Sequence, residues 1–355
     1  MFPWEKNVRK VVPYTPGEQP NVTGMVKLNT NENPYPPAPG VEKVLKGMDT
    51  DALRLYPDPT AGALVHELAA YYGLQDGQVF VGVGSDDVLA MSFMTFFNSG
   101  KPILFPDITY SFYDVWADML RIPYRTCPLD EDFRVRTEDY LTENGGIVLA
   151  NPNAPTGVEL PLDEVERIIA GNPESIVIVD EAYVDFGGHS AMNLIGKYDN
   201  LLVVQTFSKS RSLAGMRIGF ACGSTALIRF LNDVKYSFNS YTMDRTAILT
   251  GVEAVRDEAY FRNTCRMLIE TREWAKKELS ALGFSYGDSR TNFIFATHAH
   301  IPAKTLFEGL RARHIYVRYW DKPRISNYLR ITVGTREEME KLFKAVKEIG
   351  GDLNL

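Results

Sequence analysis

The residues best suited to carry chemistry in this sequence surround Lys209. An apolar run, Leu201–Phe207, ends immediately before Ser208 and Lys209, and Arg217 follows shortly afterwards. A lysine in such a place is unlike a hydrated surface charge, because burial of an amine favours its neutral form, which can form an imine with a carbonyl compound. The hydroxyl groups of Ser208 and Ser210 and the guanidinium of Arg217 suit a phosphate. The segment therefore predicts a site for a ligand with a carbonyl and a phosphate.

Asp180 adds a third requirement. It ends the apolar run Ser175–Asp180, and a buried carboxylate is costly unless it meets a cation or a strong donor. Taken alone, Asp180 is better explained as a helix cap. Together with Lys209 it indicates a ligand that also carries a basic ring nitrogen. Pyridoxal 5'-phosphate has a carbonyl, a phosphate and such a nitrogen.

A glycine-containing turn, Gly82–Ser85, offers a seat for the phosphate. Gly84 lets the backbone approach a ligand closely, and the helix expected behind Ser85 and Asp86 presents free N–H groups and its positive end. An ordinary tight turn explains these residues equally well. The third glycine of the dinucleotide fingerprint is missing, which weakens a Rossmann dehydrogenase as an alternative.

These residues follow strands of an alternating strand and helix pattern. Five short apolar runs are expected to be buried strands: Val79–Val83, Lys101–Phe105, Gly146–Ala150, Ser175–Asp180 and Leu201–Phe207. Helical patterns between them lie at Leu64–Tyr72, Asp86–Phe97 and Pro161–Ala170. Such alternation predicts a mostly parallel sheet covered by helices on both faces. Because ligands bind beyond the carboxyl ends of parallel strands, the five strand ends are expected to converge on one site.

Both ends of the chain differ from this centre. Residues 1–35 are rich in proline and asparagine, which predicts an extended N-terminal arm, and residues 36–245 form the expected large domain. Residues 246–355 read as a small α+β domain that opens with a long helix, Ala254–Ala281. Further elements are expected at Asn292–Ala296, Pro302–Arg311, Ile315–Arg318, Tyr328–Val333 and Arg336–Ile349. The predicted fold class is therefore α/β, with a smaller α+β domain and an arm.

Composition excludes several classes of function. The 355 residues carry a net charge of -7, which argues against a general binder of nucleic acid or anionic membranes. There is neither a signal-peptide pattern nor an apolar run near the ~20 residues of a membrane span. The three cysteines lack metal-ligand spacing, and the pair His298 and His300 has no further ligand nearby, so no metal site or disulfide is expected. A cytoplasmic protein is the expectation.

Motifs at the strand ends resemble those of the fold-type I pyridoxal-phosphate aminotransferases. Ser208–Lys209 is followed by Leu-Ala-Gly-Met-Arg at 213–217, residues 180–183 read Asp-Glu-Ala-Tyr, and residues 151–157 read Asn-Pro-Asn-Ala-Pro-Thr-Gly. The likeness is closest to the histidinol-phosphate aminotransferases, a class II-like branch. Motifs that indicate this branch lie at residues 7–14, 28–34, 54–57 and 329–335.

The resemblance implies a role for each matching residue. Lys209 holds the cofactor as a Schiff base, Asp180 pairs with its ring nitrogen, and Tyr183 bonds its ring oxygen. Tyr110, by residue type alone a core or rim aromatic, stacks on the ring. The residues implied to hold the phosphate are Gly84, Ser85, Asp86, Thr206, Ser208, Arg217 and Tyr56 of the partner subunit. Those implied to bind the substrate are Tyr14, Arg318 and Arg330.

One position departs from the family. An asparagine usually stands directly before Pro-Thr-Gly and bonds the ring oxygen, but here Ala154 holds that position and Asn153 stands one residue earlier. Either Asn153 reaches the ring oxygen through a shifted loop, or Tyr183 serves that oxygen alone.

The resemblance also implies the reaction and the partners. Histidinol phosphate and 2-oxoglutarate exchange an amino group for a keto group, giving imidazole-acetol phosphate and glutamate in histidine biosynthesis, with ping-pong kinetics and a homodimeric enzyme. Another amino-acid aminotransferase, such as one for aromatic substrates, and a phosphothreonine-type decarboxylase use the same core and remain alternatives. A cofactor-binding regulator without turnover is a third, which the intact Lys209, Asp180 and Tyr183 disfavour.

Overall fold

The computed structural model describes residues 2–353 and contains two sheets. The larger sheet has seven strands, with neighbours in the order β2, β8, β7, β6, β5, β3 and β4. Their bounds are β2 Val79–Gly82, β8 Gly219–Gly223, β7 Leu201–Thr206, β6 Val177–Asp180, β5 Ile147–Ala150, β3 Ile103–Pro106 and β4 Tyr124–Cys127. Six of these strands run in one direction and β8 runs against both of its neighbours. The mostly parallel α/β sheet predicted from the sequence is thus confirmed.

Helices cover both faces of this sheet, as its buried and mostly apolar central strands require. Seven α-helices precede residue 257 in the described chain: α1 Pro39–Lys46, α2 Gly62–Tyr72, α3 Gly84–Phe96, α4 Tyr113–Leu120, α5 Leu162–Gly171, α6 Thr225–Phe238 and α7 Arg245–Arg256. Val88 of α3, Trp116 of α4 and Ile228 of α6 share one core with the sheet. Leu64 of α2 and Val165 of α5 belong to the core on the opposite face.

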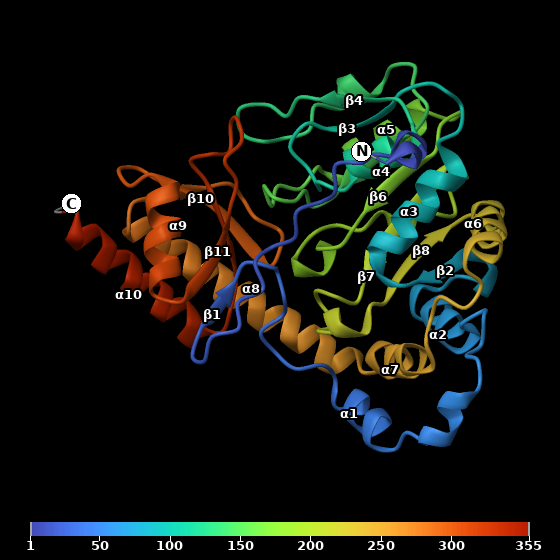
Figure 1. Ribbon diagram of the computed structural model, residues 1–355, viewed down its shortest axis with the longest axis horizontal. Coiled ribbons are helices and arrows are strands. Elements are labelled where there is room, and N and C mark those ends of the chain that lie inside the picture. Colours follow the sequence, from blue (N-terminus) through green and yellow to red (C-terminus); the bar gives the residue numbers. More distant parts are fainter. Residues whose placement is uncertain (1, 354–355) are drawn as a thin grey trace.

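The second sheet carries the arm as an edge strand. Its five strands, in order, are β1 Val26–Leu28, β11 Ile315–Tyr319, β12 Leu329–Thr332, β10 Phe293–His298 and β9 Phe284–Tyr286. β1 pairs parallel with β11, whereas the other pairs are antiparallel. Helices α8 Glu258–Ala281, α9 Ala303–Ala312 and α10 Arg336–Asp352 pack on it around a separate core. Figure 1 shows the two sheets side by side, with α8 reaching from one body to the other.

Several elements differ from the sequence prediction for physical reasons. β4 is largely exposed, with the sequence Tyr-Arg-Thr-Cys, so it lacks the apolar run of a buried strand. β8 begins and ends with glycine, which hides its strand character. The single helix predicted at Ala254–Ala281 is two helices, because Asp257 ends α7 and its side chain caps the start of α8 by accepting a hydrogen bond from the Tyr260 N–H.

The division into domains stays a prediction, but α7 bears on the boundary placed at residue 246. Ala247, Ile248 and Val252 of α7 are buried in the core of the large sheet, against α1 and α2. This packing favours a boundary further along the chain, within α8. Among residues 2–353, no helix combines the length and the apolar character that crossing a membrane requires.

Candidate active site

A pocket lies where the carboxyl ends of the parallel strands meet. The sharp reversal between β7 and the antiparallel β8 carries Ser208, Lys209 and Arg217 to this edge of the sheet. The side chains lining the pocket are Ser85, Asp86, Tyr110, Ala150, Ala154, Asp180, Ala182, Tyr183, Thr206, Ser208, Lys209 and Arg217. The predicted convergence of strand ends is therefore present, and most of the predicted cofactor residues line one cavity.

Asp180 lies at the closed end of the pocket. Its Oδ2 accepts a 2.8 Å hydrogen bond from the Tyr113 hydroxyl, and its Oδ1 accepts one of 3.2 Å from the Ala182 N–H. Burial raises the pKa of Asp180 to about 6, although both hydrogen bonds act to lower it. A cation placed in the pocket would favour the carboxylate, which is the property expected of a partner for a protonated ring nitrogen.

Lys209 faces the pocket beside Tyr183. Its Nζ donates a 3.2 Å hydrogen bond to the backbone oxygen of Thr30 in the arm and lies 5.8 Å from the centroid of the Tyr183 ring. The carbonyl oxygen of Thr30 is a neutral acceptor. Among the described residues, no carboxylate lies at hydrogen-bonding distance from the Lys209 amine. Its amine is held in the cavity without being locked into an ion pair.

The opposite end of the pocket is built for an anion. Helix α3 begins at Gly84, so the N–H groups of Ser85 and Asp86 in its first turn have no partner within the helix. Gly84 has a φ of +82°, and a Cβ there would lie 2.5 Å from Nη2 of Arg217. Arg217 also bonds Asp86 at 3.2 Å and approaches the Ser208 hydroxyl at 3.4 Å. The glycine suits this position chiefly because its φ lies in the left-handed region, which other residues rarely adopt.

Tyr110 forms the side wall between these two ends. Its hydroxyl donates a 2.7 Å hydrogen bond to Oδ1 of Asp86, which fixes the ring orientation. Burial, with the negative charge of Asp86 adding to it, raises the pKa of Tyr110 well above its usual value, so the hydroxyl stays a donor. Thr206 lines the floor, where its hydroxyl donates to the Ile218 carbonyl.

Asn153 is not among the side chains that line the pocket. Its Nδ2 donates to the Ile108 carbonyl at 2.9 Å and to the Thr156 hydroxyl at 3.0 Å, and its Oδ1 accepts from the Thr109 hydroxyl at 2.8 Å. These bonds hold the loop together and use the whole amide. Ala154 lines the pocket instead. The structure thus does not bring Asn153 to the cofactor pocket.

A second cavity continues from the first on the side of the arm. Lys209, Tyr183 and Tyr110 line both cavities, and the second adds Tyr14, Arg318 and Arg330. All three residues predicted to bind substrate are therefore brought together next to the lysine.

Arg330 is the best candidate for an anion ligand in this second cavity. Its Nη2 donates to the Asn29 carbonyl at 2.9 Å, whereas its buried Nε has no hydrogen-bond partner within residues 2–353. Desolvation lowers the pKa of Arg330, but a guanidinium stays charged in proteins. A buried charged donor without an acceptor is costly, which makes Arg330 a candidate to bind an anionic group. Arg318 instead holds the arm through the carbonyls of Thr15 and Pro16.

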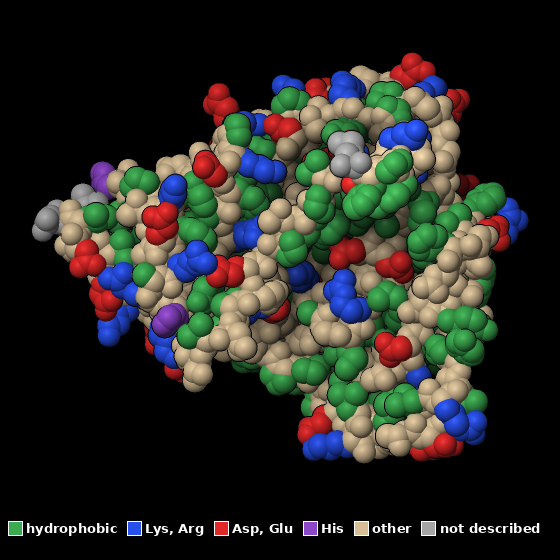
Figure 2. All heavy atoms as spheres, in the orientation of Figure 1, with side chains coloured by type: hydrophobic (Ala, Val, Ile, Leu, Met, Phe, Trp, Pro, Cys, Tyr) green, Lys and Arg blue, Asp and Glu red, His purple; other side chains and the backbone are tan. Residues whose placement is uncertain are grey.

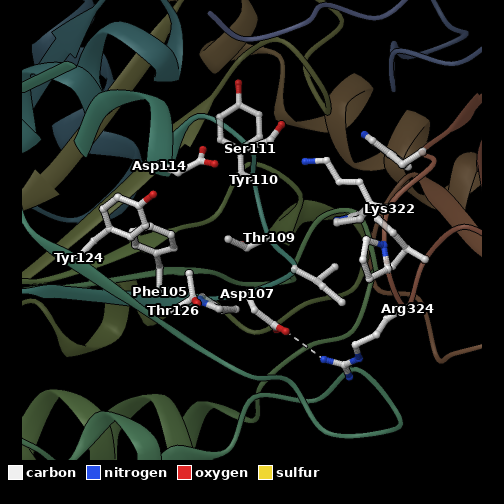
Figure 3. Close-up of a pocket in the computed structure, with 16 residues that line it drawn as sticks. Phe105, Asp107, Thr109, Tyr110, Ser111, Asp114, Tyr124, Thr126, Lys322 and Arg324 are labelled. Carbon is white, nitrogen blue, oxygen red and sulfur yellow. Dashed lines mark hydrogen bonds and ion pairs between the residues drawn. The ribbon is translucent and has the colours of Figure 1, made fainter. Parts of the chain in front are cut away.

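A third, larger cavity of about 360 Å³ opens beside Tyr110, between the large sheet and the segment that connects β11 to β12. Figure 3 shows Phe105 and Tyr124 on one side and Lys322 and Arg324 on the other. Arg324 pairs with Asp107 at 3.0 Å, and the same guanidinium donates to the carbonyls of residues 129 and 130. This contact fastens the small sheet to the large one at the mouth of the site.

Tyr56 lies outside these cavities. Its side chain is 78% exposed and lies against Tyr241, with ring centroids 4.7 Å apart. The prediction places Tyr56 in the site of a partner subunit, which a single chain does not test.

Three residues at the site have no assigned role in the sequence prediction. Tyr113 bonds Asp180, Thr30 accepts from Lys209, and the Asn31 amide donates to the Tyr183 hydroxyl at 2.9 Å. Tyr113 is the first residue of α4 and belongs to no motif identified in the sequence, so it gives no signal. Thr30 and Asn31 belong to the Leu-Asn-Thr-Asn-Glu-Asn-Pro motif. The motif marks this segment as functional but does not indicate what each of the two residues does.

The donor set matches pyridoxal phosphate group by group. The lysine amine suits its aldehyde, the buried carboxylate suits its ring nitrogen, and the start of α3 with Arg217 suits its phosphate. The exception is the ring oxygen, for which Ala154 offers no donor and Tyr183 remains.

Comparisons with known proteins agree with this reading. The sequence model of the family described as aminotransferase class I and II matches residues 23–346. The histidinol-phosphate aminotransferase of Lactococcus lactis subsp. cremoris (strain MG1363) is 52% identical over 345 residues, which cover 97% of each chain. That of Clostridium botulinum (strain Okra / Type B1) is 50% identical over 346 residues, covering 98% of each chain.

Solved structures share the fold. The histidinol-phosphate aminotransferase of Clostridium acetobutylicum matches with a TM-score of 0.85 at 20% identity, covering 93% of this chain and 100% of that one. The enzyme of Sinorhizobium meliloti, solved in complex with pyridoxal-5'-phosphate, matches with a TM-score of 0.84 at 22% identity, covering 92% and 91%. Whereas these similarities concern the fold alone, the family model and the sequence relatives show that the chain belongs to the class I and II aminotransferases and, among them, to the histidinol-phosphate aminotransferases.

Proposed function

We propose that this aminotransferase exchanges an amino group between histidinol phosphate and 2-oxoglutarate, with pyridoxal phosphate held by Lys209. The observation that supports this substrate is the buried guanidinium of Arg330, which lines the same cavity as Lys209 and whose Nε has no hydrogen-bond partner among the described residues. Histidinol phosphate brings a phosphate in place of the carboxylate that other amino donors present. The sequence relatives named above are enzymes of that substrate, which supports the same choice.

The bound cofactor supplies an aldehyde that condenses with amines and a ring that withdraws electrons from the attached carbon. Asp180 holds the charge of the ring nitrogen, and Tyr110 covers one face of the ring. Ser85, Asp86, Ser208 and Arg217 hold the phosphate through hydroxyls, N–H groups and one guanidinium. Thr206, whose hydroxyl proton goes to the Ile218 carbonyl, lines the pocket beside them. Tyr183 donates to the ring oxygen.

Lys209 does the proton chemistry in this proposal. Once a substrate amine has displaced Lys209 from the cofactor, the lysine Nζ is free and lies in the cavity that holds the substrate. Nζ would then be the general base that removes the proton from the amine-bearing carbon of the substrate and delivers a proton to the carbon of the cofactor that carried the aldehyde. The two substrates react in turn, which produces ping-pong kinetics. The Thr30 carbonyl, now bonded to Nζ at 3.2 Å, gives the free amine a neutral acceptor.

Arg330 receives both substrates. Its guanidinium bonds a phosphate from histidinol phosphate in one half-reaction and a carboxylate from 2-oxoglutarate in the other, since both anions accept two parallel N–H bonds. Tyr14, whose ring stacks on Phe112 at 4.2 Å between centroids, closes the same cavity.

The active assembly is proposed to be a homodimer. Large apolar side chains are exposed near Tyr56, namely Leu53, Leu55, Phe238 and Tyr241. Figure 2 shows hydrophobic side chains gathered over the large domain and next to the N-terminal segment. A second subunit covering them would bring its Tyr56 toward the phosphate end of the pocket. A cytoplasmic location is proposed as well, in keeping with three cysteines that are all free and buried.

Single-turnover absorbance of the purified holoenzyme with a panel of donors tests the substrate. Histidinol phosphate is expected to discharge the cofactor fastest, ahead of glutamate and far ahead of phenylalanine. Faster reaction with phenylalanine would overturn the substrate assignment and leave an aromatic aminotransferase. Release of carbon dioxide from threonine phosphate would make the protein a decarboxylase.

A further inference from the structure

The cofactor pocket lacks a donor at one position. Ala154 lines the pocket where the family carries an asparagine, and the amide of Asn153 is used up by Ile108, Thr109 and Thr156. The ring oxygen of the cofactor becomes negatively charged and therefore needs hydrogen-bond donors. Tyr183 is then the side chain that must donate a hydrogen bond to the ring oxygen. Any residue that controls the direction of its hydroxyl proton therefore affects this bond.

Asn31 contacts that hydroxyl directly. Its Nδ2 donates a 2.9 Å hydrogen bond to the Tyr183 Oη. With a lone pair of Oη taken by Asn31, the hydroxyl proton is free to point elsewhere, and Tyr183 lines the cofactor pocket. A hydroxyl that accepts a hydrogen bond is also a stronger donor, because chains of hydrogen bonds polarise one another.

Asn31 is itself held firmly. Its Oδ1 accepts a 2.9 Å bond from the Thr332 hydroxyl, whose oxygen accepts a 3.0 Å bond from the Asn31 N–H. Asn292 bonds its carbonyl at 2.9 Å, and the residue is 1% exposed. With the Thr332 hydroxyl donating to Oδ1, the amide is oriented so that its NH₂ group faces Tyr183. Its φ of +56° is a left-handed conformation that asparagine adopts more readily than most residues.

We propose that Asn31 is a positioning residue that makes Tyr183 the donor to the ring oxygen of the cofactor, and so compensates for Ala154. The inference rests on the proposed contact between Tyr183 and that oxygen. It also joins three parts of the chain, because Asn31 lies in the arm, Tyr183 follows β6 of the large sheet, and Thr332 ends β12 of the small sheet. The donor is complete only when these parts are packed together.

A spectroscopic pH titration of the holoenzyme tests the proposal. The visible absorbance of the lysine-bound cofactor changes when its imine nitrogen loses a proton. A donor to the ring oxygen stabilises the form without that proton and lowers the midpoint. Asn31→Gly removes the side chain and tolerates the left-handed backbone, and is expected to raise the midpoint by about half to one pH unit. Asn31→Asp should raise it further, because a carboxylate would draw the Tyr183 proton away from the pocket.

A double-mutant cycle separates this role from a structural one. In a Tyr183→Phe background Asn31→Gly is expected to leave the midpoint unchanged, because the neutral amide acts only through the hydroxyl, whereas Asn31→Asp should keep only the smaller rise that its added negative charge causes directly. Thr332→Val should shift the midpoint upward and Thr332→Ser, which keeps the hydroxyl, should not. Thermal unfolding of each variant is measured alongside, since lost packing would lower the melting temperature in the Phe background as well.

Two outcomes overturn different statements. If Tyr183→Phe alone leaves the midpoint unchanged, the contact between Tyr183 and the ring oxygen is wrong and the proposed cofactor placement fails with it. If Tyr183→Phe raises the midpoint but Asn31→Gly does not, or if Asn31→Gly raises it equally in both backgrounds, the role of Asn31 is wrong and the cofactor placement stands.

Discussion

The hydroxyl of Tyr113 donates a 2.8 Å hydrogen bond to Oδ2 of Asp180, and both side chains are buried. Helix α4 thereby supports the end of strand β6 at the point where the cofactor nitrogen is expected. Tyr113 stays a donor, because its burial raises its pKa well above the usual value. Asp180 is consequently oriented before any ligand arrives, yet burial keeps its pKa near 6, so it is not fully committed to the charged form at mildly acidic pH.

Cofactor binding should therefore weaken with acid. Without cofactor, Asp180 takes up a proton as the pH falls through about 6, and that proton must leave before the carboxylate can pair with a charged ring nitrogen. Below pH 6 the affinity of wild-type protein for pyridoxal phosphate should fall by about tenfold per pH unit relative to Asp180→Asn. Fluorescence titration of the cofactor-free proteins from pH 5 to pH 8 measures this ratio.

Tyr113→Phe should change the pH at which the affinity for pyridoxal phosphate begins to fall in the same titration. Loss of a donor to the carboxylate raises the pKa of Asp180 further, so the decline in affinity should begin at a higher pH, by about one unit. Because the cofactor phosphate titrates in the same range for every variant, the comparison with Asp180→Asn removes its contribution. Parallel curves for all three proteins would show that Asp180 does not face the ring nitrogen.

Lys209→Ala should abolish turnover while leaving the pocket intact. Without the amine, the cofactor is held only by its phosphate and ring contacts, and the base is missing, so the half-reaction should slow by at least 10³-fold. Stopped-flow absorbance with histidinol phosphate measures it. Added small primary amines are expected to restore part of the rate in this variant. Lys276→Ala, on α8 and paired with Glu273 and Asp288, is the control that should behave as wild type.

Arg330→Ala should impair both half-reactions. Loss of a charged, buried donor pair costs about 1.5–3 kcal/mol of substrate binding, which is roughly a 10- to 100-fold rise in KM for histidinol phosphate and for 2-oxoglutarate alike. Each half-reaction is measured separately by single-turnover kinetics. Arg262→Ala, an exposed arginine paired with Glu258, serves as the control. Wild-type values in both half-reactions would exclude Arg330 from the substrate site.

Arg324→Ala should loosen the contact between the two sheets at the mouth of the site. The pair with Asp107 is partly exposed and worth at most about 1 kcal/mol, so a rise in KM of up to about fivefold is expected, with kcat nearly unchanged. Asp107→Asn, which breaks the same ion pair, should raise KM in the same direction. If KM is unaffected by either substitution, the contact has no part in substrate retention.

Glu181 should make the protein less stable as the pH rises. It is buried with bonds from Ser190, the Ala191 N–H and Gln205, and burial raises its pKa to about 7. Between the ordinary pKa near 4.5 and this value, the native state holds a proton that the unfolded state has released. The free energy of unfolding therefore decreases with pH across that window and levels off above it.

Glu181→Gln removes this titrating group. Between pH 4.5 and pH 7.5 the free energy of unfolding of wild type should therefore fall by on the order of 2 kcal/mol more than that of the variant. Urea unfolding of the cofactor-free proteins at a fixed concentration measures the difference. Asp180 and Asp185 also have raised pKa values, but they are present in both proteins and cancel. A difference that is constant with pH would show that Glu181 keeps its ordinary titration.

By itself, the sequence determined the fold class and the chemistry of the cofactor. Apolar runs followed by Lys209, by Asp180 and by the turn at Gly84 are local patterns, and the parallel topology they imply places strand ends at one edge. Local patterns do not predict a strand whose residues lack a buried apolar run or an alternation of apolar and polar residues. The exposed β4 and the glycine-bounded β8 are the examples.

The tertiary structure alone decided which side chains meet. Asn153 is adjacent to the expected position in sequence, yet its amide is turned into its own loop, because one residue of displacement changes the direction of a side chain. Asn31 contacts Tyr183 and Thr332 from a distant part of the chain, and Tyr113 contacts Asp180 from a helix that carries no recognised motif. Such partners are set by packing between elements, and a hydrogen bond depends on tenths of an ångström that no local pattern encodes.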